Sequence, residues 1–199
     1  MPKIVDHEEQ RRIIARAAVR WIATHGVETL SQRNVAALSG RSKGNVQHYF
    51  PDKYALMFGA LRHISGEREE RERVGAGGDG GAEPFASLSR RLHAVLPIDA
   101  DIADAWRVRL SLYVYADRDP EMQAYLAQHA EAILVRGTDE VRAAQDAGQI
   151  RRDLDPRLTF QRLSAAVSGI AVAALANGGA LSADEQRAML AEVLKSITA

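Results

Sequence analysis

Residues 30–56 read LSQRNVAALSGRSKGNVQHYFPDKYAL, and this stretch decides the fold of the N-terminal part of the chain. Its pattern predicts two short helices, over residues 31–38 and 42–50, joined by a tight turn around Gly40. This plan is typical of a helix-turn-helix motif, whose second helix enters the DNA major groove. Both helices carry apolar residues at a spacing that lets them pack against a preceding helix: Val35, Leu38, Val46 and Phe50.

Charge placement favours a DNA-binding surface over a plain helical hairpin. Lys43 falls in the first turn of the 42–50 helix, and Lys53 in the first turn of the helix that follows. A cation at a helix N-terminus is destabilising by roughly 0.3–1 kcal/mol, because it lies at the positive end of the helix dipole. A bound phosphate would remove this cost, since the lysine and the helix N-terminal amides would both bind it. The outward face of the 42–50 helix also offers groups suited to base edges and phosphates, and a glycine that permits close approach: Lys43, Asn45, Gln47, His48, Tyr49 and Gly44.

The composition divides the chain into a basic and an acidic part. Residues 1–65 contain ten Lys and Arg against five Asp and Glu, whereas the remainder contains sixteen against twenty-one. This asymmetry indicates a polyanion-binding N-terminal part. The chain has no cysteine, which excludes disulfides and thiolate metal sites. Its N-terminus has no apolar signal-peptide segment, so a cytoplasmic protein is expected.

The rest of the chain shows helical periodicity nearly throughout. Helices are expected over about residues 6–25, from 53 to 73, and over 84–96, 99–117 and 120–148, with two more beginning near 156 and 183. Asp119-Pro120, Asp155-Pro156 and the capping-box residues Ser182 and Glu185 mark helix starts. The apolar stretch 163–183 is interrupted by Gly, Ser and Asn, so we expect a buried helix, not a membrane span. The predicted fold is all-α, with about nine helices.

Residues 8–65 resemble the DNA-binding domain of the TetR/AcrR family of regulators. The matching elements are Gly26, Val35-Ala36, Gly40, Ser42-Lys43-Gly44, Tyr49-Phe50, Pro51, Lys53 and Leu56. The resemblance implies a three-helix helix-turn-helix DNA-binding domain over residues 1–52 and a helical ligand-binding and dimerisation domain over 53–199. Family members often carry Thr at 45 and Tyr at 47; Asn45 and Gln47 here could each read adenine.

The resemblance also implies roles for individual residues. Ser31, Tyr49 and Lys53 would contact phosphates, and Arg33 a base or a phosphate. Lys43, Gly44, Asn45 and Gln47 would face the major groove. The complete predicted DNA-binding set is Ser31, Arg33, Arg41, Lys43, Gly44, Asn45, Gln47, His48, Tyr49 and Lys53.

From Trp106 onward the chain is similar to choline-responsive betaine-pathway regulators within the family. The resemblance rests on Trp106-Arg107-Val108, Asp119-Pro120, Gly148-Gln149-Ile150 and Leu154-Asp155-Pro156. Aromatic residues of the middle helices could enclose a quaternary ammonium group, or could simply be core. The predicted effector pocket consists of Phe85, Leu88, Trp106, Tyr113, Tyr125, His129 and Phe160.

In this family the last two helices commonly form a four-helix bundle with those of a second subunit. Small residues in the helix after Pro156 permit such close approach, although they could also belong to an intramolecular core. The predicted dimer interface consists of Ala166, Gly169, Ile170, Ala173, Leu190, Val193 and Leu194.

The sequence thus predicts a homodimeric repressor that binds a palindromic DNA operator and is released by a small-molecule effector. The alternatives are an activator and a helical ligand-binding dimer without specific DNA binding. We expect no enzyme activity, cofactor, metal or membrane association, because no catalytic motif or metal-ligand spacing occurs.

Overall fold

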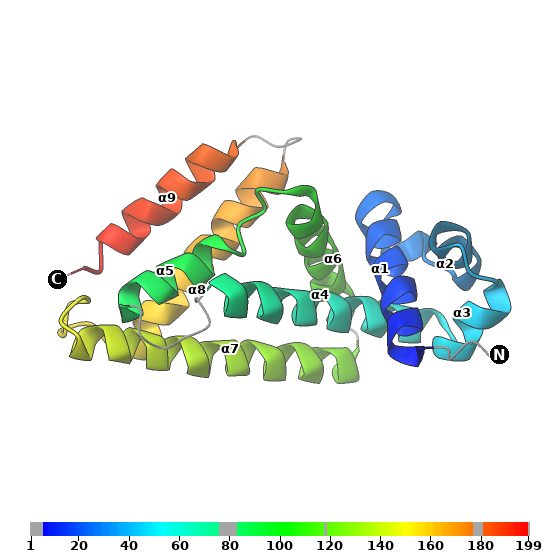
Figure 1. Cartoon of the computed structure of the whole chain (residues 1–199), viewed down its shortest axis with the longest axis horizontal. Coiled ribbons are helices and arrows are strands. Elements are labelled where there is room, and N and C mark those ends of the chain that lie inside the picture. The colour runs from blue at the N-terminus through cyan, green and yellow to red at the C-terminus, as the bar shows by residue number, and fades with distance from the viewer. Residues whose placement is uncertain (1–5, 76–82, 118, 177–180, 199) are drawn as a thin grey trace. The chain divides into compact units, whose positions relative to one another are not determined.

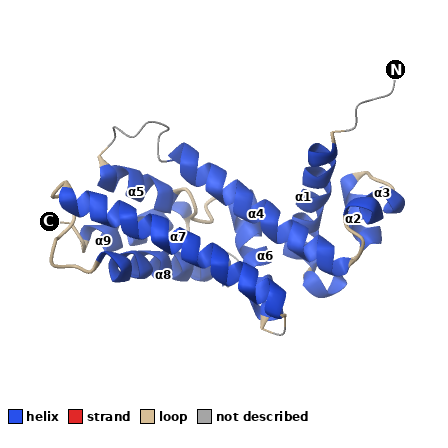
Figure 2. Cartoon of the chain, turned by 90° about the horizontal axis from the view of Figure 1, so that it is seen from below, coloured by secondary structure: helices blue, strands red, loops and turns tan. Residues whose placement is uncertain are grey.

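The computed structural model describes residues 6–75, 83–117, 119–176 and 181–198. These residues form α1 (His7–His25), the 3-10 helix η1 (Val27–Thr29), α2 (Gln32–Ser39), α3 (Lys43–Tyr49), α4 (Lys53–Gly75), α5 (Pro84–His93), α6 (Ala100–Ala116), α7 (Pro120–Asp146), α8 (Pro156–Leu175) and α9 (Ala183–Lys195). Within these ranges Figure 2 shows helices and connecting loops but no strand, which confirms the predicted all-α fold.

The chain separates into two compact units. Unit 1 comprises Met1–Glu67 and Asp104–Met122, and unit 2 comprises Arg68–Ala103 and Gln123–Ala199. Unit 1 therefore holds α1 to α3 together with the first part of α4, most of α6 and the first residues of α7. The functional boundary predicted between residues 52 and 53 divides the chain differently and remains a prediction.

In unit 1, α1 packs against α2, and α2 packs against α3 (Figure 1). Ile14 and Ala18 of α1, Val35 of α2 and Val46 of α3 are fully buried, as the apolar spacing predicts. Leu38 is an exception, because its side chain is 44 % exposed. Burial of Ile14, Val35 and Val46 stabilises the motif by roughly 1.5–3 kcal/mol per side chain.

Local capping places the ends of the first helices. The Asp6 carboxylate accepts a hydrogen bond from the Glu9 amide at 3.1 Å and caps α1. Gly40 adopts a left-handed conformation with φ of 67° and ends α2, so glycine is required at this turn. The Ser42 hydroxyl then accepts from the Asn45 amide at 3.1 Å and caps α3.

Unit 2 is built mainly from α5, α7, α8 and α9 (Figure 2). The predicted caps are present here as well: Asp155 accepts from the Leu158 amide at 2.7 Å, and Ser182 and Glu185 form a capping box. Helix α8 is long and apolar enough to cross a membrane by length and composition alone. Leu163, Val167 and Ile170 of this helix recur at helical spacing and are buried inside the chain.

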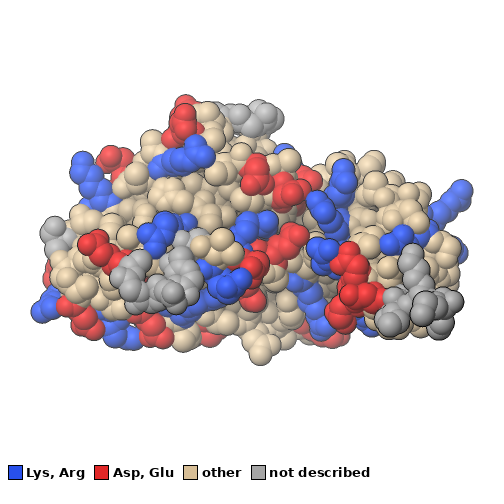
Figure 3. Space-filling model, in the orientation of Figure 1, with Lys and Arg blue, Asp and Glu red and all other residues tan. Residues whose placement is uncertain are grey.

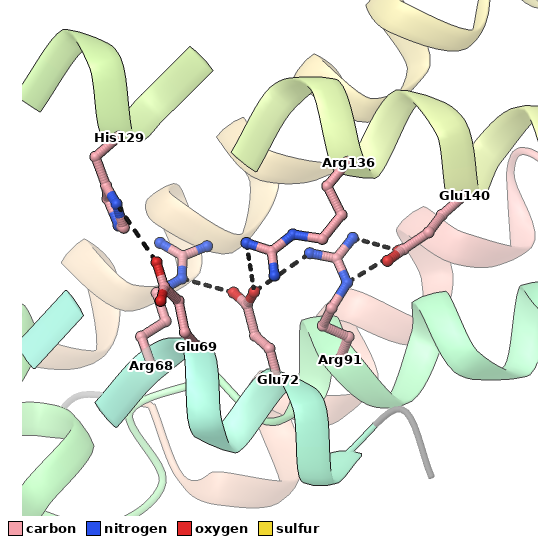
Figure 4. A network of polar contacts seen from close by, with 7 residues as sticks. All are labelled: Arg68, Glu69, Glu72, Arg91, His129, Arg136 and Glu140. Carbon is pink, nitrogen blue, oxygen red and sulfur yellow. Dashed lines mark hydrogen bonds and ion pairs between the residues drawn. The ribbon is translucent and has the colours of Figure 1, made fainter. Parts of the chain in front are cut away.

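A buried ionic network joins three helical segments of unit 2 (Figure 4). The Arg91 guanidinium of α5, 3 % exposed, lies between the carboxylates of Glu72 on α4 and Glu140 on α7. Glu72 is also buried and accepts from Nε of Arg68 at 2.7 Å. The same guanidinium of Arg91 lies 5.4 Å from the ring centroid of Phe160, on α8.

Candidate nucleic-acid interface

The predicted DNA-binding residues all lie in unit 1, on α2, α3 and the segments that flank them. They differ in accessibility. Five are exposed, namely Arg33, Lys43, Gly44, Gln47 and His48. Four are half-buried, namely Ser31, Arg41, Asn45 and Lys53, and Tyr49 is buried.

The exposed face of α3 is defined by Lys43 and Gln47, which are four residues apart and therefore lie on the same side of the helix. Gly44 stands beside them. A Cβ atom built at Gly44 would meet nothing within 4 Å, and its backbone conformation does not require glycine. The protein's own packing thus gives no reason for glycine here, which is consistent with close approach by another molecule.

Asn45 is placed differently from Gln47. Its side-chain oxygen Oδ1 is buried and has no hydrogen-bond partner. Gln47, two residues further along α3, is exposed. The two amides predicted to read bases therefore differ, because the side-chain oxygen of Asn45 is buried whereas the side chain of Gln47 is exposed.

Tyr49 is held by contacts with α1 that the sequence did not reveal. Its hydroxyl oxygen lies 2.8 Å from Nδ1 of His7, and the guanidinium of Arg11 lies 5.7 Å from its ring centroid. His48 packs edge-on against the same ring. His7 and Arg11 are one helical turn apart, but only the packing of α1 near the end of α3 brings them to Tyr49.

Lys53 begins α4, and its ammonium group donates to the main-chain oxygen of Glu28 at 2.8 Å. Glu28 lies in η1, so this bond ties the start of α4 to the turn that follows α1. Ser31 serves as the N-cap of α2, where its hydroxyl accepts from the Asn34 amide at 3.2 Å. Arg41 lies in the turn after Gly40, and its Nε is buried without a hydrogen-bond partner.

The basic excess of the N-terminal residues does not form one continuous patch on the face shown in Figure 3, where acidic and basic side chains are intermingled. Glu8 and Glu9 occupy the first turn of α1. Nε of Arg12 donates to Glu9 at 2.7 Å, and this bond lowers the pKa of the Glu9 carboxyl. The negative charge of Glu9 is thus paired with that of Arg12 within α1.

Among the cavities formed by the described residues are two that lie in unit 1. One, of about 490 Å³, is lined by Val27, Glu28, Ser111, Val114, Tyr115, Asp117 and Asp119. The other is an open groove of about 940 Å³ along the first turns of α1, the end of α3 and α4, with Arg11, Tyr49, Tyr54 and Phe58 among its lining residues.

The predicted effector-pocket residues line neither of these cavities. Trp106 and Tyr113 belong to unit 1, and Tyr113 is 50 % exposed. The other five lie in unit 2. There the rings of Tyr125 and His129 are parallel at 6.3 Å, and Leu88 is fully buried. Phe160 packs against Gly137, Phe85 is half-buried, and the pocket they were predicted to form remains a prediction.

The predicted dimer-interface residues lie on α8 and α9, which pack against each other within unit 2. Ile170, Leu190 and Leu194 are buried in the single chain, while Ala166 and Val193 are half-buried. Gly169 and Ala173 are exposed, and the neighbouring Val172 is 46 % exposed. Gly169, Val172 and Ala173 thus mark a part of α8 that is uncovered in the single chain.

Two family models match the chain. Residues 14–60 match the family described as bacterial regulatory proteins, tetR family, and residues 84–199 match the family described as BetI-type transcriptional repressor, C-terminal. The second match alone spans more than half of the 199 residues. The chain belongs to the TetR family.

Individual relatives agree with this assignment. The chain is 25 % identical over 197 residues to the regulator PksA of Bacillus subtilis, covering 99 % of this chain and 94 % of that protein. It is 29 % identical over 180 residues to the repressor Rv1474c of Mycobacterium tuberculosis, covering 89 % of each chain. A Saccharomonospora viridis transcriptional regulator, crystallised in complex with choline, has the same fold, with a TM-score of 0.87, 24 % identity, and coverage of 97 % of this chain and 100 % of that one.

The TetR-family chain is therefore a DNA-binding transcriptional regulator with a BetI-type C-terminal domain, which confirms the resemblance drawn from its sequence. The expectation that it is not an enzyme is also confirmed, since the matching families and relatives are regulators. TetR-family regulators bind DNA operators, so the helix-turn-helix of unit 1 is the part of the chain suited to that task.

Proposed function

We propose that this protein is a cytoplasmic repressor that binds a palindromic operator as a homodimer and leaves it when a small-molecule effector binds. The observation that carries the proposal is the exposed face of α3, where Lys43 and Gln47 flank a glycine that the protein's own packing does not require. The turn that leads into this helix is defined locally, because Gly40 ends α2 in a left-handed conformation and Ser42 caps α3. The match of residues 84–199 to BetI-type repressors supports repression over activation.

The proposed contacts follow from position. Lys43 and Gln47 would read base edges, with Gly44 allowing the backbone to approach the groove. Lys53, Ser31 and Tyr49 would bind phosphates, which fix register and carry the salt-dependent part of the affinity, and Arg33 would bind a base or a phosphate. The remaining members of the proposed DNA-binding set are Arg41, Asn45 and His48.

The proposed dimer uses α8 and α9 of each subunit. Exposed small residues at Gly169 and Ala173 would let the helices of a second copy approach closely, and two-fold symmetry would match a palindromic operator. A Cβ atom at Gly169 would meet nothing within 4 Å in the single chain. Replacement of this glycine should therefore disturb only an assembled dimer.

The dimer is tested by light scattering after gel filtration. Wild type and the α7 control Ala143→Glu, an exposed substitution elsewhere in unit 2, should both elute as dimers. Gly169→Leu should be folded by circular dichroism but shifted toward monomer. A wild type that is monomeric at micromolar concentration would refute the proposed assembly.

The effector is proposed to bind in the BetI-type domain and to shift the protein toward a conformation with lower DNA affinity. Choline is the first probe, because the structurally similar Saccharomonospora viridis regulator was crystallised with it. Release from a selected operator is followed by fluorescence anisotropy during titration with choline chloride, with sodium chloride at equal ionic strength as the control. Release by choline alone supports this effector, and equal responses to both salts reject it.

A further inference from the structure

A hydrogen bond links the first turn of α1 to the last turn of α3. Nδ1 of His7 lies 2.8 Å from the hydroxyl oxygen of Tyr49, across a separation of 42 residues in the sequence. The two rings are tilted by 56°, with centroids 5.9 Å apart. Both residues belong to unit 1.

The Tyr49 ring has little freedom to turn. Its residue is 7 % exposed, the guanidinium of Arg11 lies 5.7 Å from its centroid, and the His48 ring packs edge-on against it at 4.9 Å. Tyr49 also lines the open groove beside α1. The position of the phenol oxygen is therefore set by packing, and only the direction of its proton remains to be decided.

That direction matters for binding a phosphate. A phenol has one proton to donate and lone pairs that accept. When Nδ1 of His7 carries a proton, it donates to the phenol oxygen, and the phenol proton stays available for an outside acceptor. When Nδ1 is unprotonated, Tyr49 donates its proton to His7, and a phosphate oxygen would meet only lone pairs.

We propose that His7 is a positioning residue for DNA binding. Its Nδ1–H bond to Tyr49 directs the phenol proton toward a phosphate oxygen of the operator backbone. The inference rests on the proposed function, in which Tyr49 contacts a phosphate. His7 acts through Tyr49 and makes no contact with DNA of its own.

A double-mutant cycle tests this role. Dissociation constants for one selected operator duplex are measured for the full-length wild type, His7→Ala, Tyr49→Phe and the double variant. Loss of one such hydrogen bond is expected to weaken binding about three- to tenfold. Each single variant should show this loss, and the double variant should bind no more weakly than Tyr49→Phe.

Two further variants separate positioning from stability. His7→Asn keeps an amide that can donate near the place of Nδ1, so it should restore most of the affinity. His25→Ala removes another exposed histidine of α1, one stacked on Trp21, and should leave the dissociation constant within about twofold of wild type. Thermal unfolding of each variant shows whether the fold is retained.

Three outcomes would overturn the inference. If His7→Ala leaves the affinity unchanged while Tyr49→Phe lowers it, His7 has no positioning role. If His7→Ala weakens binding by the same factor with and without the Tyr49 hydroxyl, its effect is merely structural. If Tyr49→Phe has no effect, the phosphate contact itself is absent and the inference falls with it, whereas specific DNA binding by wild type would still stand.

Discussion

The ammonium group of Lys53 donates to the main-chain oxygen of Glu28 at 2.8 Å, so the free protein already holds this lysine at the N-terminal end of α4. A phosphate bound there would meet both the ammonium group and the helix amides. Lys53→Ala should therefore weaken binding to all duplexes alike and reduce the slope of log affinity against log salt by about one.

Anisotropy titrations at several salt concentrations measure this slope. Lys195→Ala, a lysine in the last turn of α9, serves as the matched control and should leave the slope unchanged. An unchanged slope for Lys53→Ala would show that this residue makes no phosphate contact.

Gln47 and Asn45 should differ in their effect on base preference. Gln47 is exposed, whereas Oδ1 of Asn45 is buried without a partner. Gln47→Ala should relax selection at one base pair of each half-site, at a cost of about 1–3 kcal/mol in discrimination, and Asn45→Ala should change it less. Selection from a randomised duplex library, repeated with each variant, compares the two; a larger change with Asn45→Ala would reverse this assignment.

Gly59 allows α4 to approach the ring of Phe50. A Cβ atom at this position would overlap that ring, whereas one at Gly66 of the same helix would meet nothing within 4 Å. Gly59→Ala should lower the free energy of unfolding by about 1–3 kcal/mol, and Gly66→Ala should leave it unchanged or raise it by up to about 1 kcal/mol. Urea denaturation of both variants tests the contrast, which equal effects would contradict.

Arg91 should matter far more to stability than an exposed arginine. Its guanidinium is buried between Glu72 and Glu140, and its removal would take one of three arginines away from the buried Glu72 carboxylate, which would keep Arg68 and Arg136 (Figure 4). Arg91→Met should cost about 3–5 kcal/mol of unfolding free energy. Arg142→Met, which breaks an exposed pair with Asp139, should cost no more than about 0.5 kcal/mol. Denaturant unfolding compares the two, and similar losses would argue against a structural role for the network.

Tyr54 should make the stability of the protein sensitive to alkaline pH. Burial, then the nearby carboxylates of Asp119 and Glu121, raise the pKa of its hydroxyl from 10.0 to about 12. The folded state thus holds this proton more tightly than the unfolded state. The resulting stability is fully present below pH 10 and is lost as the pH rises toward 12.

Unfolding free energies on either side of pH 10 test this linkage. Wild type should lose more stability between pH 9 and pH 11.5, values chosen to bracket the unfolded pKa of about 10, than Tyr54→Phe, in which other titrating groups are unchanged. Equal losses in both proteins would contradict the raised pKa.

The sequence predicts most helix ends because capping is local. Asp6, Ser42 and Asp155 each accept from an amide three residues ahead, so a pattern of a few residues contains both partners. The end of α2 at Gly40 is predictable for the same reason, because the left-handed conformation that ends the helix involves a single residue.

The sequence does not predict contacts between distant segments. The bonds from His7 to Tyr49 and from Lys53 to Glu28 join residues 42 and 25 positions apart, and they depend on how whole helices pack. The burial of Arg91 among residues of three other helical segments has the same origin. Leu38 was predicted to be buried but is exposed, because helical spacing alone does not distinguish a core position from one at the edge of the core.

The most direct test of the account is a comparison of two duplexes in one anisotropy titration. One duplex carries a selected palindrome with half-sites about 34–36 Å apart, and the other carries the same bases in scrambled order. The account predicts saturable binding to the palindrome with an affinity at least about 10³-fold above that for the scrambled duplex at physiological salt. Equal affinity for the two duplexes, or a selection that enriches no sequence, would contradict the claim that this helix-turn-helix reads a specific operator.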